Sequence, residues 1–162
     1  MTCGDAVDPV SVHALWLAQD DPKKNTAVLA SKRGDVRLHK RVQTLPKKGV
    51  ILEPLCGKVL GPEDHELLTS RRGAIVGLDC SWKHIESSVR EVMNKTRLQA
   101  RTLPLLLAAN PVNWGKPGKL TTAEAVAAAL YLVGRSDQAR DVLGAFRWGK
   151  RFFELNQEPL DA

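Results

Sequence analysis

Short apolar runs that end at turns or polar residues recur along this chain and predict the strands of a sheet. Continuous runs of this kind are typical of strands covered on both faces, as in a parallel sheet. A weaker alternation over residues 37–42 predicts a strand at an edge of the sheet. The strands that we expect cover residues 12–18, 37–42, 50–52, 74–78 and 105–109.

Segments with helical periodicity or capping signals separate most of these runs. Ile85, Val89 and Met93 recur at four-residue spacing, which predicts an amphipathic helix over residues 83–94. The other helices that we expect cover residues 27–32 capped by Asn25 or Thr26, 61–68, 122–133 ended by Gly134, and 137–146 capped by Ser136. Strands that alternate with helices predict an α/β fold with a mainly parallel central sheet flanked by helices.

Residues 101–125 run from an apolar segment through a polar loop into a helix start. Asn110-Pro111 ends the expected strand, because the proline ring disfavours helix at the preceding residue and removes a backbone donor. Thr121 and Glu124 form a capping box ahead of an alanine-rich helix. In α/β proteins, ligands usually bind where a loop leaves the carboxyl end of a buried strand. We therefore expect a small polar cofactor here; the alternative is an ordinary strand–loop–helix connection.

The composition is that of an ordinary globular protein with one core. Of the 162 residues, 43% are apolar and 26% are charged. Residues 1–10 show no pattern and predict a loose tail. No apolar run approaches the roughly 20 residues of a membrane span, and the N-terminus lacks the pattern of a signal peptide. We therefore expect a cytoplasmic protein with no membrane partner.

The cysteine and histidine residues show no metal-site pattern. Cys3, Cys56 and Cys80 are widely spaced, and none of the four histidines clusters with them. We therefore expect no metal. Cys80 is interpreted as a small buried residue, with a nucleophile as the alternative.

Positive charge is unevenly distributed along the chain. The net charge is +6, and residues 23–48 contain nine basic residues against one acid, Asp35. Such clustering is the electrostatic footprint of a phosphate-rich partner, and the alternative is a solvated basic surface. Because aromatic residues are sparse in this stretch, folded RNA recognised through its shape and backbone fits better than base stacking.

Four sequence blocks resemble the motifs of the small-subunit ribosomal RNA aminocarboxypropyltransferase family, in its archaeal form. They appear in the family's order and span the chain from about Trp16 onward. The blocks are DDPKKNTA at 20–27, GLDCSW at 77–82, LPLLLAANPVNWG with KLTTAEAVAAALYLVG at 103–134, and FRWGKRFFELN at 146–156.

The resemblance implies an activity and a fold. The reaction is transfer of the 3-amino-3-carboxypropyl group of S-adenosylmethionine to N3 of a pseudouridine, or N1-methylpseudouridine, in small-subunit rRNA, with release of methylthioadenosine. The fold is SPOUT-like, of the RNA methyltransferase type, with a C-terminal trefoil knot that periodicity cannot show. The chain then divides into the tail 1–10, a basic RNA-contacting lobe at 11–65 and a cofactor-binding lobe at 66–162.

Asp79 is the catalytic candidate. It follows the expected strand 74–78, where an acid can accept the imide proton of the target base. It can equally position the base or the amino group of the cofactor, or simply cap the helix that follows. These three roles stay open on the sequence.

The resemblance also implies the binding residues. Trp82 would form a flat apolar wall of the pocket, with a partly buried core residue as the alternative. The further cofactor contacts are Thr26, Leu78, Leu103, Gly118 and Thr122. The clustered positive charge, rather than the resemblance, gives the RNA-phosphate candidates Lys23, Lys24, Arg33, Arg97 and Arg101, each with a solvated surface charge as the alternative. The implied partner is small-subunit rRNA or a pre-ribosomal subunit, bound by a monomer.

The chain departs from the family pattern at a few positions. Gly118 stands where the family commonly has a tyrosine, and Glu53 and Gly61 stand where a serine is usual. Two other functions remain open on the sequence. One is an RNA methyltransferase on the same scaffold, and the other is a non-catalytic assembly factor that holds pre-rRNA by charge.

Overall fold

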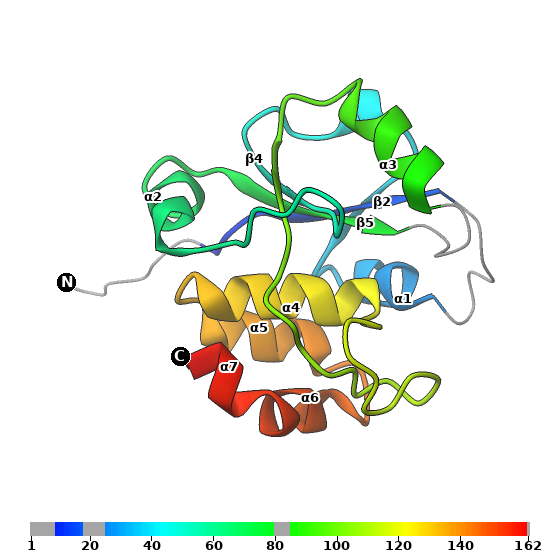
Figure 1. Ribbon diagram of the computed structural model, residues 1–162, viewed down its shortest axis with the longest axis vertical. Helices are drawn as coiled ribbons and strands as arrows, with labels where there is room; N and C mark the ends of the chain where they lie inside the picture. Colours follow the sequence, from blue (N-terminus) through cyan, green and yellow to red (C-terminus); the bar gives the residue numbers. More distant parts are fainter. Residues whose placement is uncertain (1–8, 18–24, 80–84, 162) are drawn as a thin grey trace.

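A five-stranded parallel sheet forms the centre of the protein, shown by a computed structural model that describes residues 9–17, 25–79 and 85–161 (Figure 1). The strand order is β3-β2-β5-β4-β6, and every pairing is parallel. The strands are β2 (Val12–Trp16), β3 (Arg37–His39), β4 (Gly49–Leu52), β5 (Ala74–Asp79) and β6 (Gln99–Arg101). The predicted α/β fold with a parallel central sheet is therefore confirmed.

Helices cover both faces of this sheet. In Figure 1, α3 lies on one side, and α1, α4 and α5 lie on the other, with α6 and α7 beyond them. The helices are α1 (Thr26–Lys32), α2 (His65–Leu68), α3 (Ile85–Met93), α4 (Thr122–Leu132), α5 (Ser136–Leu143), α6 (Gly149–Leu155) and α7 (Gln157–Asp161), with single 3₁₀ turns η1 (Val42–Thr44) and η2 (Pro62–Asp64).

Each face of the sheet has its own apolar core. On the α4 side, Ala14, Val50 and Ile75 pack in one cluster with Val126 and Leu130 of α4. On the α3 side, a smaller cluster contains Leu15, Ile51, Val76, Val92 and Leu98. The central strands are buried on both faces, which explains why β2, β4 and β5 have continuous apolar runs in the sequence.

Local capping chemistry agrees with the sequence. The Asn25 side chain accepts a hydrogen bond from the Val28 backbone N–H at 3.0 Å and so caps α1. Thr121 and Glu124 form the predicted capping box of α4. Gly134, with φ of 86°, follows the end of this helix in the left-handed conformation that glycine adopts without strain.

The strand predicted at 105–109 is wrong. The run is apolar because Leu106, Ala108 and Ala109 are buried, but the backbone does not join the sheet. Gly118 N–H donates to the Leu106 carbonyl at 2.9 Å, and side chains from α6 and α4 satisfy further backbone groups of the run. The edge strand is instead β6, which was missed because its polar residues (Gln99 and Arg101) hide the strand pattern.

The C-terminal helices also differ from the prediction. Ser136 is the first residue of α5 rather than its cap, and the helix ends at Leu143 instead of continuing to Phe146. The cap position is Arg135, whose side chain makes no capping hydrogen bond. α6, which lies within the fourth sequence block, and α7, which follows the block, were not predicted as helices.

The expected lobes share this sheet. β5, from the segment 66–162, lies between β2 and β4, which both belong to the segment 11–65. Because a strand of one segment lies between two strands of the other, the two segments must fold against each other. Because all five strands are parallel, their carboxyl ends lie at one edge of the sheet.

A chain of hydrogen bonds closes the β2–β3 edge. Ser11 Oγ is 2.6 Å from His13 Nε2, His13 Nδ1 is 2.7 Å from His39 Nε2, and His39 Nδ1 is 2.8 Å from Thr44 Oγ1. The Thr44 hydroxyl donates to the Arg41 carbonyl at 2.9 Å, and a carbonyl can only accept. Burial lowers the pKa of both histidines, which favours their neutral forms at pH 7, and in these forms each histidine donates through Nδ1 along the chain.

This chain predicts an acid-sensitive fold. Burial, with smaller effects of His39 and Arg37, lowers the pKa of His13 from 6.5 to about 4, and burial also lowers the pKa of His39. Between these two values the unfolded chain binds a proton that the folded chain does not, so stability falls as the pH falls from 6.5 towards 4. His13 alone lowers the free energy of unfolding by about 2 kcal/mol between pH 7.5 and pH 5.

Urea unfolding at a series of pH values measures this effect. His65 is exposed, so His65→Gln should keep the same slope of the free energy of unfolding against pH. Replacement of both His13 and His39 by Gln should flatten it, whatever the stability of that variant at pH 7.5. An equal slope in the double variant and the unmodified chain would assign the acid sensitivity to other groups.

Candidate functional site

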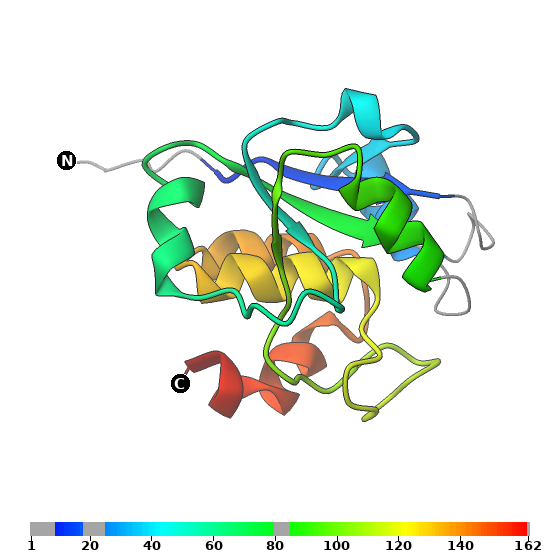
Figure 2. The ribbon, with the colours of Figure 1, turned by 45° about the horizontal axis from the view of Figure 1, so that its top comes forward.

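A cavity of about 740 Å³ lies at the carboxyl edge of the sheet. Its walls come from the residues at and just after the ends of β4, β5 and β6, from the starts of α1 and α4, and from the segment 102–121. That segment runs in front of α4 and turns back to the start of the helix (Figures 1 and 2). Parallel strands that end at one edge leave a crevice of this kind, which is the usual ligand position in α/β proteins.

Gly77 allows α4 to approach β5 closely at the cavity. A Cβ atom at this position would lie 2.9 Å from Thr122 Cγ2 and 3.0 Å from Val126 Cγ1. Any larger residue would therefore push the first turns of α4 away from the sheet. The absence of a side chain at Gly77 places Thr122 in the cavity wall, beside the end of β5.

The Glu124 carboxylate holds both ends of the 109–121 loop. It has no solvent exposure. Its Oε1 accepts hydrogen bonds from Asn110 Nδ2 at 2.7 Å and from the Thr121 backbone N–H and hydroxyl at 2.9 and 3.1 Å. Its Oε2 accepts from the Ala109 backbone N–H at 2.6 Å. One side chain thus joins the beginning of the loop to the beginning of α4.

Asn156, at the end of α6, holds the segment just before this loop. Its Oδ1 accepts from the Leu107 N–H at 2.7 Å, and its Nδ2 donates to the Leu107 carbonyl at 2.9 Å. Asn156 is almost fully buried. The fourth sequence block, near the C-terminus, therefore holds in place the segment that forms this part of the cavity wall.

Six of the catalytic and cofactor-binding candidates line this cavity: Thr26, Leu78, Asp79, Leu103, Gly118 and Thr122. They come from sequence segments separated by up to about 95 residues. The hydroxyl oxygen of Thr26 accepts a hydrogen bond from the Ala123 N–H at 3.2 Å, which joins the start of α1 to the start of α4. Gly118 has φ of 71°, and its N–H donates to the Leu106 carbonyl, so a turn of the loop forms its part of the wall. Trp82 and Cys80 lie outside the described residues.

Glu53 also lines the cavity, although the sequence marked it only as a departure from a serine. It directly follows β4, and only 4% of its surface is exposed. Within the described residues, its Oε1 atom is buried without a hydrogen-bond partner. Its position after a buried strand is the signal that could have identified it, since Asp79 at the end of β5 occupies the same edge.

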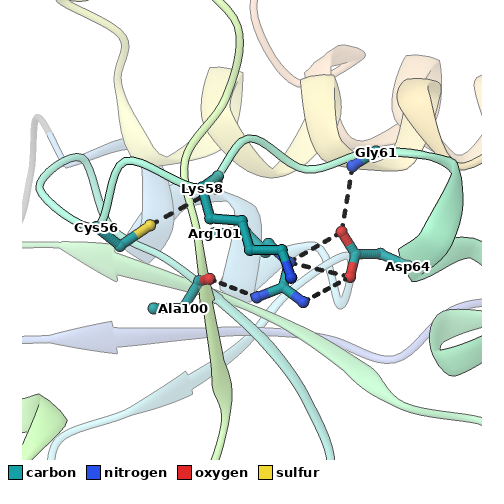
Figure 3. A network of polar contacts seen from close by, with 6 residues as sticks. All are labelled: Cys56, Lys58, Gly61, Asp64, Ala100 and Arg101. Atoms are coloured by element: carbon teal, nitrogen blue, oxygen red, sulfur yellow. Dashed lines mark hydrogen bonds and ion pairs between the residues drawn. The ribbon is translucent and has the colours of Figure 1, made fainter.

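Arg101, one of the RNA-phosphate candidates, lies in a largely buried ion pair with Asp64 (Figure 3). Its side chain is 10% exposed, and its Nε and Nη2 atoms lie 3.0 Å from the Asp64 carboxylate. Nη1 donates to the Ala100 carbonyl at 2.7 Å. Asp64, itself buried, also accepts from the Gly61 N–H at 3.1 Å. The guanidinium is thus part of a buried ion pair that fixes η2 against β6. Arg101 is also one of the residues that line the cavity.

The other RNA candidates remain predictions. Arg33 and Arg97 are exposed, and Arg33 lies 3.6 Å from the Asp35 carboxylate. Lys23 and Lys24 lie outside the described residues. Within the described part of the chain, no three His, Cys, Asp or Glu side chains cluster so as to hold a metal ion. None of the helices described is long and apolar enough to cross a bilayer.

Comparison with known proteins gives the family. The family model described as "Ribosome biogenesis protein, C-terminal" matches residues 50–162. The 16S rRNA aminocarboxypropyltransferase of Methanosarcina acetivorans is 43% identical over 152 residues, which cover 94% of this chain and 84% of that protein. The chain belongs to this aminocarboxypropyltransferase family. A second member, from Methanothermobacter thermautotrophicus, is 44% identical and covers 88% of this chain and 82% of its own length.

A solved structure of the family agrees with the fold. The SAM-dependent rRNA:acp-transferase Tsr3 from Vulcanisaeta distributa matches with a TM-score of 0.84 and 39% sequence identity. The match covers 93% of this chain and 80% of that chain. The parallel sheet flanked by helices is therefore the architecture of the aminocarboxypropyltransferase family as well as of this chain.

The Glu124 contacts predict a large effect of a nearly isosteric change. In Glu124→Gln the side-chain amide retains one acceptor, so its NH₂ group must face either the Ala109 N–H or the Asn110 and Thr121 donors. We expect the free energy of unfolding to fall by about 2–3 kcal/mol, because buried donors lose their acceptor. Denaturant unfolding measures the change, and Glu154→Gln, at a side chain that is 67% exposed, is the control. Equal stability of the two variants would contradict the role of Glu124.

Proposed function

We propose that this chain transfers the 3-amino-3-carboxypropyl group of S-adenosylmethionine to N3 of a pseudouridine, or N1-methylpseudouridine, in small-subunit rRNA. The observation that carries the proposal is that residues from three of the family-like sequence blocks line one cavity: Thr26, Asp79 and Leu103 with Thr122. The named relatives are 16S rRNA aminocarboxypropyltransferases, and they match this chain over most of its length.

The cavity has the chemistry to bind this donor molecule. Leu52, Leu103 and Leu120 give it apolar wall against which an adenine ring can pack. A buried acceptor without a partner, such as Oε1 of Glu53, costs about 1–3 kcal/mol, and a ligand that donates a hydrogen bond removes this cost. The carboxylates of Glu53 and Asp79 favour a ligand that carries positive charge, as the sulfonium and ammonium groups of S-adenosylmethionine do.

The contribution of the protein is chiefly orientation. A sulfonium carries three carbon atoms open to attack, and the product depends on which one faces the nucleophile. For this transfer, N3 of the base forms a bond to the terminal methylene of the aminocarboxypropyl arm. The bond from that methylene to sulfur breaks, and methylthioadenosine leaves with the electron pair. The imide proton of the base passes to an acceptor, for which Asp79 is the candidate in the cavity wall.

The finer features of the proposal rest on the family resemblance. They are a C-terminal trefoil knot in a SPOUT-like fold, a cofactor-binding lobe at 66–162, and a basic RNA-contacting lobe at 11–65. Arg33 and Arg97, which are exposed, are the described residues proposed to contact RNA phosphates. We propose a monomer that acts in the cytoplasm on rRNA or a pre-ribosomal subunit.

Donor labelling tests the reaction itself. S-adenosylmethionine labelled in its carboxyl carbon should leave label on the rRNA, and S-adenosylmethionine labelled in its methyl group should not. The reverse result would establish a methyltransferase. No transfer from either donor, with no heat on titration of S-adenosylmethionine, would favour a non-catalytic RNA-binding assembly factor.

Asp79→Asn tests the role of the carboxylate. If Asp79 accepts the proton or positions the base, the variant should bind S-adenosylmethionine within about twofold of the unmodified affinity. Single-turnover transfer should slow by about 100-fold or more, the usual contribution of a positioned acid–base group. Rapid-quench measurement of labelled rRNA gives this rate. An unchanged rate would remove Asp79 from the chemistry and leave it a structural role at the end of β5.

A further inference from the structure

A second cavity, of about 650 Å³, lies beside β3. Three cationic side chains line it: Arg37 in the strand, and Lys40 and Arg41 directly after the strand ends. All three are exposed residues. We call this hollow the basic cavity.

The positive charge of the basic cavity is not neutralised inside the described part of the chain. Among the described residues, Arg37, Lys40 and Arg41 form no ion pair with a carboxylate. The histidines in the wall, His13 and His39, are neutral, and both of their N–H groups are used within the hydrogen-bond chain from Ser11 to Thr44. The wall therefore presents mainly Arg and Lys donors to a ligand, which is the chemistry that binds phosphate.

The sheet register places the basic cavity close to the larger one. His39 is paired with Leu15 in β2, and Leu15 is paired in turn with Leu78 in β5. Neighbouring strands are about 4.8 Å apart, so the backbones at His39 and Leu78 are separated by roughly 10 Å. Leu78 lines the larger cavity and His39 lines the basic cavity, so the two cavities have wall residues that are separated by one strand, β2.

Trp16 occupies the strand between them. It is paired in register with Asp79 of the larger cavity, and its ring lies 5.9 Å from Nζ of Lys40 of the basic cavity. Trp16 is half-buried, and aromatic faces next to cations are common contact points for nucleotides. The order along the edge is thus Asp79, Trp16, Lys40.

We propose that the basic cavity binds a backbone phosphate of the rRNA strand that flanks the target nucleotide, while the target base enters the larger cavity beside Asp79. This assignment rests on the proposed function for the nature of the substrate. It adds a contact that neither the family-like motifs nor the expected RNA residues contain. The strand would cross the carboxyl edge of the sheet over Trp16, so the phosphate contact would set which nucleotide reaches the cofactor.

Charge-neutralising variants test the phosphate contact. We compare Arg37→Gln/Arg41→Gln with a control, Lys47→Gln/Lys48→Gln, which removes the same charge from exposed residues outside both cavities. Affinity for an rRNA fragment that contains the target is measured over a series of salt concentrations, and S-adenosylmethionine affinity is measured by calorimetry. We expect the cavity variant to bind RNA about 10-fold more weakly than the control. In a plot of the logarithm of the RNA-binding constant against the logarithm of the salt concentration, the slope for the cavity variant should be smaller in magnitude by about 0.7, the value for one lost phosphate contact to a single strand.

The affinity for S-adenosylmethionine shows whether the variants remain folded. It should stay within twofold of the unmodified value in both pairs. If the double variant fails this criterion, Lys40→Gln, a single change at an exposed residue, replaces it and should give a smaller loss in the same direction. Equal RNA affinity and equal salt slopes of the cavity and control variants would overturn the proposal.

Uncharged methylphosphonate links placed singly around the target nucleotide identify the phosphate. One position should weaken binding by the unmodified protein and have no further effect on the cavity variant. A methylphosphonate effect of the same size in both proteins at every position would overturn the proposal. The proposed function is tested separately, because unmodified protein that shows this pattern but transfers no aminocarboxypropyl group would contradict the function and leave the phosphate site in place.

Discussion

The buried carboxylate of Glu124 is the contact on which the larger cavity depends. A carboxylate is costly to remove from water unless hydrogen bonds replace its hydration. Glu124 receives four donors, from Ala109, Asn110 and Thr121, and these donors lie at the two ends of one loop. The loop and the first turn of α4 are therefore fixed in one geometry. Asn156 and the glycine at position 77 complete this arrangement, the first by holding Leu107 and the second by admitting α4 to the sheet.

The parallel sheet gathers the functional chemistry at one edge. Because every strand runs in the same direction, Glu53, Asp79 and Arg101 follow or end three adjacent strands at that edge. Arg101 is neutralised by Asp64 inside the wall, whereas the cations beyond β3 are not paired within the described residues. The edge consequently changes from acidic, at the proposed donor site, to basic, at the proposed phosphate site. This division suits a reaction between a cationic donor and a polyanionic substrate.

Much of the fold follows from local signals in the sequence. The apolar runs of β2, β4 and β5, the four-residue spacing of α3 and the cap of α4 were predicted correctly, and Asn25 was one of the two caps expected for α1. Each of these features depends on residues near in the chain. The run 105–109 was misread because apolar character reports burial, not strand pairing. Its backbone partners are Asn156 and Glu124, which no local pattern links to it.

The sequence by itself determined the fold class, the start of α4 and the family, because periodicity, capping and motif order are written in consecutive residues. It also singled out six catalytic and cofactor-binding candidates that line the larger cavity, although their roles remain predictions. Only the tertiary structure decided that Arg101 is buried against Asp64, that Glu53 faces the cavity, and that Arg37, Lys40 and Arg41 lie one strand away from the site. Strand order and register bring these groups together, and both arise from contacts between residues distant in the chain, where the identity of a side chain does not reveal its neighbours.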